Sequence, residues 1–344
     1  MKYILNITVV LLFLFTFSAF SEQVFVDGVE FQSLQEAKSA IKDGSQIYLK
    51  AGIYTKGIYI KANNINIIGE KNVIFDDAAI NGKAALVLTG DNVLVESIEC
   101  RNMHVRDKNG ACIRFEGKNL TLRDIYAHDS QSGVMTSRNN GFVNIEHSKF
   151  ERLGGKGTGR GYAHGVYIKA KELYINNSIF LSTKGEGTAV KSRSESTIIE
   201  NSIIASLEAK DSRLIDVSNK GELIIKNSIL QQGNHSSNSQ LIGYGLEGGE
   251  SEYKKNRIDV RDNLFLLDRK SANVIIKYKN VSEKNVQITN NLLIGDFLYT
   301  DKYIENNSWY FSRKKARIKP FPYLPNISEL PKLINAISIV GERN

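Results

Sequence analysis

A short pattern of apolar and polar positions recurs along the chain from residue 64 to residue 293. Each copy contains an aliphatic residue, a variable residue, usually a small polar residue, two more variable residues and then usually a large apolar one, as in LYINNSIF and LIIKNSIL. The central small or polar residue marks the repeat, and successive markers are 23 to 35 residues apart. Short β-rich phrases at such a period predict a solenoid of stacked coils. The markers are Gly69, Ser97, Asp124, His147, Asn177, Asn201, Asn227, Asp262 and Asn290.

A second apolar segment precedes each copy and predicts another strand in every coil, as in ACIRFE, HGVYIK, TAVKSR and RLIDVS. Side chains on a strand point alternately to opposite faces, so the inward apolar residues locate the outward ones. Val166 and Ile168 are expected to point inward and Tyr167, between them, outward. Adjacent coils stack about 4.8 Å apart, which brings outward residues of neighbouring strands together. The residues predicted to share this outward face are Arg114, Tyr167, Lys169, Lys191, Arg193 and Asp216.

Proline is confined to the C-terminal end of the chain. All four prolines lie within the last 25 residues, from Pro320 onward. A strand that is hydrogen-bonded on both sides cannot spare its backbone N–H, which is the situation of every strand inside a β-helix. The repeat and the proline distribution together predict an all-β fold, a single-stranded parallel β-helix.

Both ends of the predicted solenoid differ from the repeat. Residues 24–29 predict a short strand, and Ser33 to Glu36 has the spacing of a capping box that opens a helix through Ile41. Such an N-terminal helical cap would cover the open end of the first coil. We therefore expect a β-helix domain with its cap over residues 22–308 and a non-repeating C-terminal cover over residues 309–344.

The first 21 residues have the pattern of a secretory signal peptide. Lys2 precedes an apolar stretch from Val9 to Phe17, and small residues lead to a cleavage site near Ser21. This stretch is too short to span a bilayer, and no later apolar run is long enough. The sequence thus predicts an exported protein, periplasmic or extracellular, with no membrane span.

The chain carries a formal net charge of +8, which becomes +7 without Lys2. A basic exported protein is suited to a polyanion, whether acidic polysaccharide, nucleic acid or an anionic envelope surface. Nucleic acid is disfavoured because the predicted outward face lacks aromatic residues interleaved with the basic ones. Cys100 and Cys112 have two interpretations, a disulfide or two half-buried thiols in neighbouring coils.

The densest polar group lies between residues 154 and 219, where a glycine-rich basic segment leads into the strand that carries Tyr167. Lysines and arginines on a solenoid face are often only solvated surface, and Asp216 has the alternative of a structural ion pair. A column of such residues on adjacent coils favours function, since Thr, Ser or Val would serve an ordinary outward position. The predicted cationic groove comprises Tyr167, Lys191 and Asp216 in one column, Lys169 and Arg193 in the next, and His164 at the strand entrance.

Asparagines at the marker position have a structural interpretation. Asn177, Asn201 and Asn227 occupy a turn inside the coil. We expect their side chains to form a hydrogen-bonded asparagine ladder between coils.

The repeat, the missing prolines and phrases such as GIYTKGIYIKANNINIIGE and YINNSIF resemble the pectate-lyase-like proteins. The resemblance covers nearly the whole exported chain and implies a right-handed parallel β-helix. That superfamily contains polysaccharide lyases, glycoside hydrolases and uronate epimerases, so the resemblance implies carbohydrate processing without fixing the reaction.

The segment GEGTAVKSR is similar to a part of chondroitinase B and alginate lyases in which a calcium-binding glutamate stands five residues before a catalytic lysine. The similarity implies Glu186 as a calcium ligand and Lys191 as the lysine. Two departures put calcium in doubt. Those lyases have an RHG phrase one coil later, where this chain has Arg213 and IDVSN, and Lys184 stands where another glutamate ligand is expected. Lys184 is thus a candidate to supply the positive charge instead.

The leading hypothesis is a polysaccharide lyase that cleaves an acidic, uronate-containing polymer by β-elimination. This reaction needs a cation for the carboxylate, a base for the C5 proton and an acid for the leaving oxygen. The predicted roles are Lys191 or His164 as base, Arg193 and Arg160 as carboxylate neutralisers, Tyr167 as acid, and Asp216 as the residue that orients Lys191.

Three other functions compete with the lyase. A glycoside hydrolase would need two carboxylates, for which the outward face offers Asp216 with Glu116 or Glu186. A uronate epimerase would share the proton abstraction, and a non-catalytic matrix protein would need only the basic face. In each case we expect a monomer that contacts acidic polysaccharide. The residues predicted to bind it are Arg160, Lys169, Lys184, Arg213, Asn219, Arg114 and Tyr244.

Overall fold

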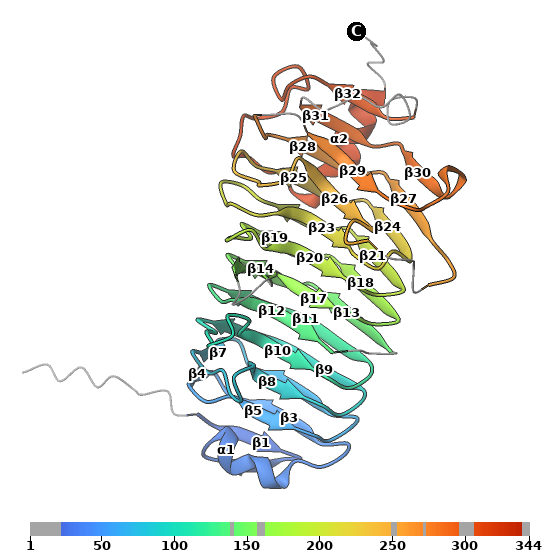
Figure 1. Ribbon diagram of the computed structural model, residues 1–344. Coiled ribbons are helices and arrows are strands. Elements are labelled where there is room, and N and C mark those ends of the chain that lie inside the picture. The colour runs from blue at the N-terminus through green and yellow to red at the C-terminus, as the bar shows by residue number, and fades with distance from the viewer. Residues whose placement is uncertain are drawn as a thin grey trace, which may run out of the picture.

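The computed structural model describes residues 22–137, 141–156, 162–248, 253–270, 273–295 and 306–338. The chain winds as a right-handed parallel β-solenoid whose coils stack from the N-terminal cap to the C-terminal helix (Figure 1). The fold class predicted from the repeat is therefore confirmed. The predicted signal peptide, residues 1–21, lies outside the described residues.

One wall of the solenoid is a nine-stranded parallel sheet with one strand from each successive coil. Inward residues of these strands, such as Ile113, Val190 and Ile215, are completely buried, as the alternation predicts. The strands are β5 (Ile58–Ile60), β8 (Ala84–Leu88), β10 (Ala111–Phe115), β12 (Ser132–Thr136), β17 (Val166–Ile168), β20 (Thr188–Ser192), β23 (Arg213–Val217), β26 (Gln240–Tyr244) and β29 (Val274–Tyr278).

The remaining wall is a larger sheet, to which most coils contribute two consecutive strands. The sheet bends between these two strands, so it consists of two rows. The first row comprises β3 (Gln46–Leu49), β6 (Asn66–Gly69), β13 (Phe142–Glu146), β18 (Glu172–Asn176), β21 (Ser196–Glu200), β24 (Glu222–Lys226), β27 (Arg257–Arg261) and β30 (Val286–Thr289). The second row comprises β4 (Gly52–Tyr54), β7 (Val73–Asp76), β14 (Lys149–Glu151), β19 (Ile179–Leu181), β22 (Ile203–Ala205), β25 (Ile229–Gln232), β28 (Leu264–Leu267), β31 (Leu292–Gly295) and β32 (Ser308–Tyr310). In two coils a single strand spans both rows, namely β9 (Val93–Arg101) and β11 (Leu120–His128).

The marker residues make the bend between the two rows. Eight of the nine have left-handed backbone conformations, with φ between 47° and 60°: Ser97, Asp124, His147, Asn177, Asn201, Asn227, Asp262 and Asn290. Asn and Asp tolerate this conformation better than most residues with a side chain, which explains their frequency at the marker. The repeat read from the sequence is therefore a repeat of one backbone turn.

The ladder inside this turn is made by the residue after the marker, so the predicted asparagine ladder was wrong in position. Asn177 and Asn227 are exposed, and Asn201 bonds Asn176. The next residue points inward and accepts the backbone N–H of the coil before it, as Ser178 does from Ser148 at 3.2 Å. The same bond recurs through the acceptors Ser148, Ser178, Ser202, Ser228, Asn263, Asn291 and Asn307.

The N-terminal end is closed by the predicted cap, but the single strand expected over residues 24–29 is interrupted by a turn at residues 27 and 28. Strands β1 (Val24–Val26) and β2 (Val29–Phe31) form an antiparallel pair, and β1 also pairs with β3. Helix α1 (Leu34–Ala37) begins after Ser33, whose hydroxyl accepts the Glu36 N–H, and continues as the 3-10 helix η1 (Lys38–Ala40). The side chains of Leu34 and Ala37 are buried in the same core as β1 and β3.

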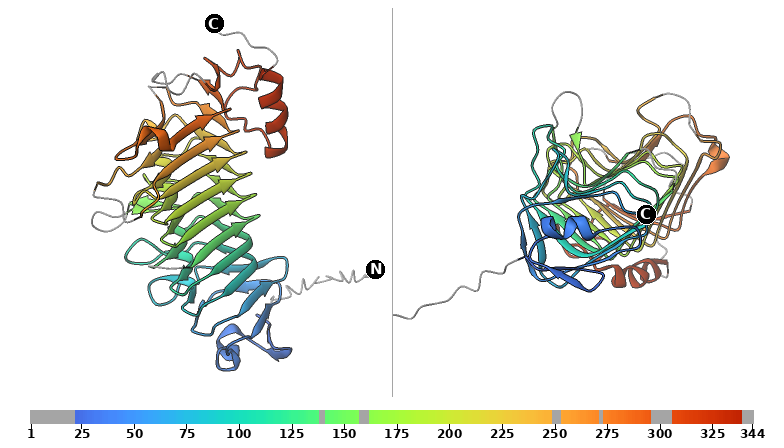
Figure 2. Two further views of the ribbon diagram at one scale, coloured as in Figure 1. Left: turned by 90° about the vertical axis from the view of Figure 1, so that its right-hand side faces the viewer. Right: turned by 90° about the horizontal axis from the view of Figure 1, so that it is seen from below.

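The C-terminal segment packs beside the coils, as Figure 2 shows for the red helix α2 (Leu330–Ser338). Leu330 and Ile318 contact outward apolar residues of β25, β28 and β31, including Leu264. Strand β32 pairs with β31, so the stack extends to Tyr310, two residues into the predicted cover. The other short elements are β15 (Gly155–Lys156), β16 (Tyr162–Ala163), and the 3-10 helices η2 (Glu283–Asn285) and η4 (Ile327–Glu329).

Cys100 and Cys112 form a disulfide, which decides between the two interpretations left open by the sequence. Cys100 is the second-last residue of β9, and Cys112 lies in β10 of the nine-stranded sheet. Both are fully buried, so the bond joins the two sheets inside the solenoid. None of the helices in the described residues is long and apolar enough to cross a membrane.

Candidate active site on the nine-stranded sheet

The predicted column of outward residues exists on the nine-stranded sheet. Tyr167 of β17 is directly opposite Lys191 of β20, and Lys191 is opposite Asp216 of β23. The next position in the column is Gly243 of β26. Three groups that could carry charge or transfer a proton are therefore adjacent, separated by single strand spacings.

These residues form one network of ion pairs and hydrogen bonds. Lys191 Nζ donates to Asp216 Oδ2 at 3.1 Å and to a second carboxylate, that of Glu247. Arg193 donates from Nε to the Tyr167 hydroxyl oxygen at 2.7 Å, and from its Nη atoms to Asn219 Oδ1 at 2.6 Å and to Glu247. The side chains of Lys191 and Asp216 are only 11% and 8% exposed, so each charge depends on its partners for compensation.

Glu247 is a member of this network that the sequence did not reveal. It lies beyond β26, outside any strand, and its side chain is 40% exposed. Burial acts to raise the pKa of Glu247, but the bonds and charges of Lys191 and Arg193 outweigh burial and lower it. A loop has no alternation from which its side-chain direction could be inferred, so only its position in the fold identifies this residue.

Arg213, which the sequence predicts as a substrate-binding residue, completes the charged part of the site. Its Nη1 atom lies 3.5 Å from Asp216 Oδ1. The guanidinium lies across Gly243, where an added Cβ would come within 2.4 Å of Nη1, so glycine makes room for the arginine. Among the described residues no hydrogen-bond acceptor contacts the buried Nε of Arg213.

His164 is placed at the site, but its bonding argues against the predicted role as a base. Its Nδ1 atom accepts the Thr188 backbone N–H at 3.1 Å, and the ring packs edge-on against Tyr167. Burial, together with the nearby Lys191 and Arg193, lowers the pKa of His164 to about 3. The ring is therefore neutral, with its proton on Nε2, and can donate a hydrogen bond but not accept a proton there.

A cavity of about 320 Å³ opens beside the column. Its lining includes short polar residues from the turns that enter β23 and β26, namely Ser212, Ser237 and Asn238. Both signs of charge face it, so it suits a polar ligand. Its lining includes His164, Glu186, Lys191, Arg213, Asp216 and Glu247.

The other predicted polymer-binding residues differ in their relation to this cavity. Arg114 belongs to the same column but is separated from Tyr167 by Met135, and it pairs with Glu116 at 3.1 Å. Lys169 follows β17 and is partly exposed, and Lys184 is exposed in a turn. Arg160 lies outside the described residues.

Tyr244 was wrongly predicted to bind substrate. It is opposite Val217, one position after the outward pair Asp216 and Gly243, so it points into the core. Its side chain is fully buried, and its hydroxyl donates to the Gly221 carbonyl at 2.6 Å. Burial raises the pKa of Tyr244, and no part of its side chain reaches the outer face.

Glu186 was implied as a calcium ligand. It lines the cavity, and its carboxylate pairs with Lys210 at 2.8 Å and accepts from Ser237. The described residues contain no group of three or more His, Cys, Asp and Glu side chains suited to a metal. A single carboxylate that is already paired with a lysine does not fit the six to eight oxygen ligands that calcium takes.

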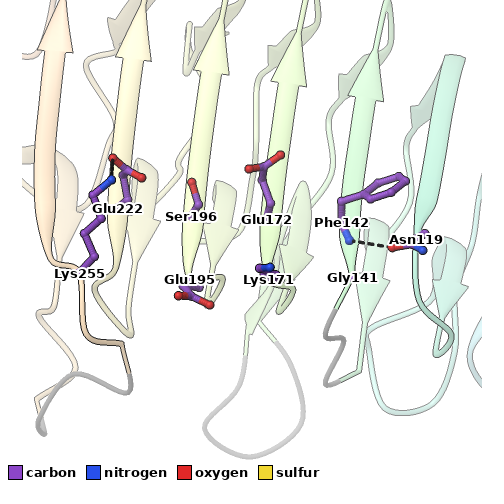
Figure 3. Close-up of a pocket in the computed structure, with 9 residues that line it drawn as sticks. All are labelled: Asn119, Gly141, Phe142, Lys171, Glu172, Glu195, Ser196, Glu222 and Lys255. Atoms are coloured by element: carbon purple, nitrogen blue, oxygen red, sulfur yellow. Dashed lines mark hydrogen bonds and ion pairs between the residues drawn. The ribbon is translucent and has the colours of Figure 1, made fainter.

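A larger cavity, of about 460 Å³, lies on the other wall (Figure 3). Phe142, Glu172, Ser196 and Glu222 stand in register on adjacent strands there, and Lys255 pairs with Glu222 at 2.8 Å. Its lining holds three glutamates against two lysines and no histidine or tyrosine. It therefore lacks the histidine and the tyrosine that lie at the column.

Comparison with known proteins concerns the fold. The chain aligns with a tailspike capsular polysaccharide depolymerase of Acinetobacter baumannii bacteriophage Fri1 at 11% identity and a TM-score of 0.45, over 77% of this chain and half of that one. Pectate lyase Pel9A gives 17% identity and a TM-score of 0.44, over 76% of this chain and 74% of that one. Pectin methylesterase from Yersinia enterocolitica gives 10% identity and a TM-score of 0.41, over 85% and 98%.

No curated protein sequence matches the chain. The family model described as the right handed beta helix region matches residues 43–204. That span begins just before β3 and ends within β22, so it includes Tyr167 and Lys191 of the column but not Asp216. With the parallel register of both sheets, it shows that the chain has a right-handed parallel β-helix fold.

Proposed function

We propose that the protein is an exported polysaccharide lyase that cleaves an acidic, uronate-containing polymer by β-elimination. One observation carries the proposal. Lys191 and Arg193 present two cationic groups to one carboxylate, that of Glu247, directly beside the Tyr167 hydroxyl. A uronate carboxylate bound by the same two cations would bring its sugar ring next to groups that can transfer protons.

The roles follow from the bonds that each group already makes. In β-elimination the C5 proton goes to a base, its electron pair forms the C4–C5 double bond, and the C4–O bond breaks as the oxygen gains a proton. Arg193 would neutralise the carboxylate. Lys191 would first pass one of its own protons to Asp216, to which it is hydrogen-bonded, and would then accept the C5 proton as the free amine. The Tyr167 oxygen accepts the Arg193 Nε–H, which leaves its own O–H to donate to the leaving oxygen.

A glycoside hydrolase is less well supported by the same geometry. It needs one carboxyl group that keeps a proton as general acid. The two carboxylates at the column, Asp216 and Glu247, both bind Lys191, and the pKa of Glu247 is lowered. The epimerase remains the alternative on this fold, because it also begins by removing the C5 proton.

The test is to incubate the purified protein with a panel of acidic polysaccharides and follow ultraviolet absorbance. Elimination creates an unsaturated uronate that absorbs, so rising absorbance supports the proposal. New reducing ends without absorbance would indicate hydrolysis, and exchange of the C5 proton with solvent without cleavage would indicate epimerisation. Binding with none of these signals would leave a matrix protein.

A further inference from the structure

We infer that Glu247 occupies the position of the substrate carboxylate and thereby selects acidic sugars. A ligand must displace this side chain from Lys191 and Arg193 to reach the column, and only an anionic ligand restores the pairing that displacement removes. The inference rests on the proposed function for the identity of the ligand. It concerns binding, so it can be tested separately from turnover.

The Glu247 carboxylate contacts Lys191 and Arg193 in the way that a bound carboxylate ligand would. The two oxygens of Glu247 go to different donors, Oε1 to Lys191 Nζ and Oε2 to an Nη atom of Arg193. These donors are two residues apart on the same side of the chain at the end of β20. One carboxylate therefore bridges both cations, which is the arrangement a bound uronate would need.

The two carboxylates of the network differ in how easily they can leave. Asp216 belongs to β23 and is 8% exposed, so moving it would disturb the sheet and strand a buried charge. Glu247 lies outside the strands and its side chain is already 40% exposed, so it can return to water at little cost. Glu247 is thus the partner that a ligand can replace.

Charge balance gives the selectivity. Lys191, Arg193 and Arg213 face two carboxylates, Asp216 and Glu247. When Glu247 leaves, a ligand carboxylate restores this balance, whereas a neutral or methyl-esterified sugar leaves two largely desolvated cations with one fewer partner. Leaving buried charges unpaired is costly, and that cost excludes the uncharged ligand.

The test compares Glu247→Gln with the wild type for binding of a panel of oligouronides and their methyl esters, by calorimetry at constant ionic strength. Glutamine keeps the shape and loses the competing charge, so we expect binding of the acidic oligouronide that the wild type binds to tighten about tenfold. Methyl-ester binding should strengthen by a similar factor, because the ester no longer has to displace a charged partner from Lys191 and Arg193. The control is Glu195→Gln, which makes the same change in net charge at the cavity on the other wall and should alter neither affinity.

Two outcomes would overturn the inference. Unchanged acid binding in Glu247→Gln would mean that the side chain does not compete with the ligand. Weaker acid binding, with the fold intact by circular dichroism, would mean that Glu247 contacts the substrate directly. The proposed function can fail on its own. If the wild type shows no elimination but Glu247→Gln binds the acidic oligouronide more tightly, the lyase proposal is wrong and the inference about Glu247 stands.

Discussion

Lys191 is the residue on which the proposed chemistry depends most. It is held from one side by Asp216 and from the other by Glu247, and it faces the cavity. Replacing it with alanine should reduce kcat by about 10²–10⁴-fold, because general-base catalysis is typically worth that much. The rate of absorbance increase at saturating polymer measures this loss.

A matched control separates this effect from a general loss of positive charge. Lys255→Ala removes a lysine that is 62% exposed and lies at the cavity on the other wall, so it should leave turnover unchanged. Near-normal activity in Lys191→Ala, or an equal loss in both variants, would move the chemistry away from the column.

Asp211 gives the stability of the protein a dependence on pH. Its carboxylate is completely buried and accepts hydrogen bonds from the Ser206 and Ser236 hydroxyls, and burial raises its pKa from 3.8 to about 6. Between these values the folded state binds more protons than the unfolded state, so stability falls as pH rises from about 4 to 6 and is level above. The loss is about 3 kcal/mol.

Asp211→Asn should remove this fall, since the amide can bond both hydroxyls without ionising. Urea unfolding of both proteins from pH 4 to pH 8 measures the difference, which should favour the variant increasingly up to about pH 6–7. A difference that is constant across this range would show that Asp211 does not titrate in the folded protein.

Single residues show where sequence reasoning succeeded and where it failed. Alternation along a strand placed Tyr167, Lys191 and Asp216 in register, because strand geometry fixes which residues face outward. The same rule applied to β26 would have placed Tyr244 in the core, opposite the inward Val217. Glu247 was missed because its position depends on a loop, for which sequence provides no such rule.

The turn between the two strand rows is the element that the repeat encodes. The small polar marker correctly predicts the turn, but the hydrogen-bonded ladder is made by the residue that follows the marker and not by the marker itself. The marker adopts a left-handed conformation, and the following Ser or Asn makes the ladder. Sequence alone does not separate the two roles, because both favour short polar side chains.

The ladder predicts a measurable contribution to stability. Ser178→Ala removes the acceptor of the buried Ser148 N–H, and leaving a buried donor unsatisfied costs about 1–3 kcal/mol. Ser196→Ala, on the outer face of β21, should cost less than about 0.5 kcal/mol. Urea unfolding of the two variants measures their losses of unfolding free energy. Equal losses would mean that the ladder does not contribute to stability.

The molecule as a whole carries an excess of positive charge, +8 over the full sequence. If the ligand is a polyanion, screening should weaken its binding steeply as salt increases. Titrations of the bound polymer at several salt concentrations give the slope. An affinity that does not change with ionic strength would argue for a neutral glycan and against the lyase.

The overall architecture was the most predictable property, because a stacked repeat imposes the same constraints on every coil. Proline exclusion from the strands and the capping box at Ser33 both reflect hydrogen bonding that the structure displays. The path of the C-terminal segment was not predictable in detail. Its apolar residues dock on the outward side chains of β25, β28 and β31, and outward apolar residues also occur on other coils, such as Ile179 and Leu181 of β19.

The length of the coils varies, but the register of their strands does not. A change in loop length can therefore occur without a change in the position of the residues on the strands. The longest interval between markers, 35 residues from Asn227 to Asp262, is the one that contains Glu247. If Glu247 selects the ligand as we propose, shortening or exchanging that interval would alter which sugars the site accepts, and the column of Tyr167, Lys191 and Asp216 would keep its place. A protein built in this way can acquire a new ligand specificity through a single insertion or deletion in a loop, while the side chains on its strands stay unchanged.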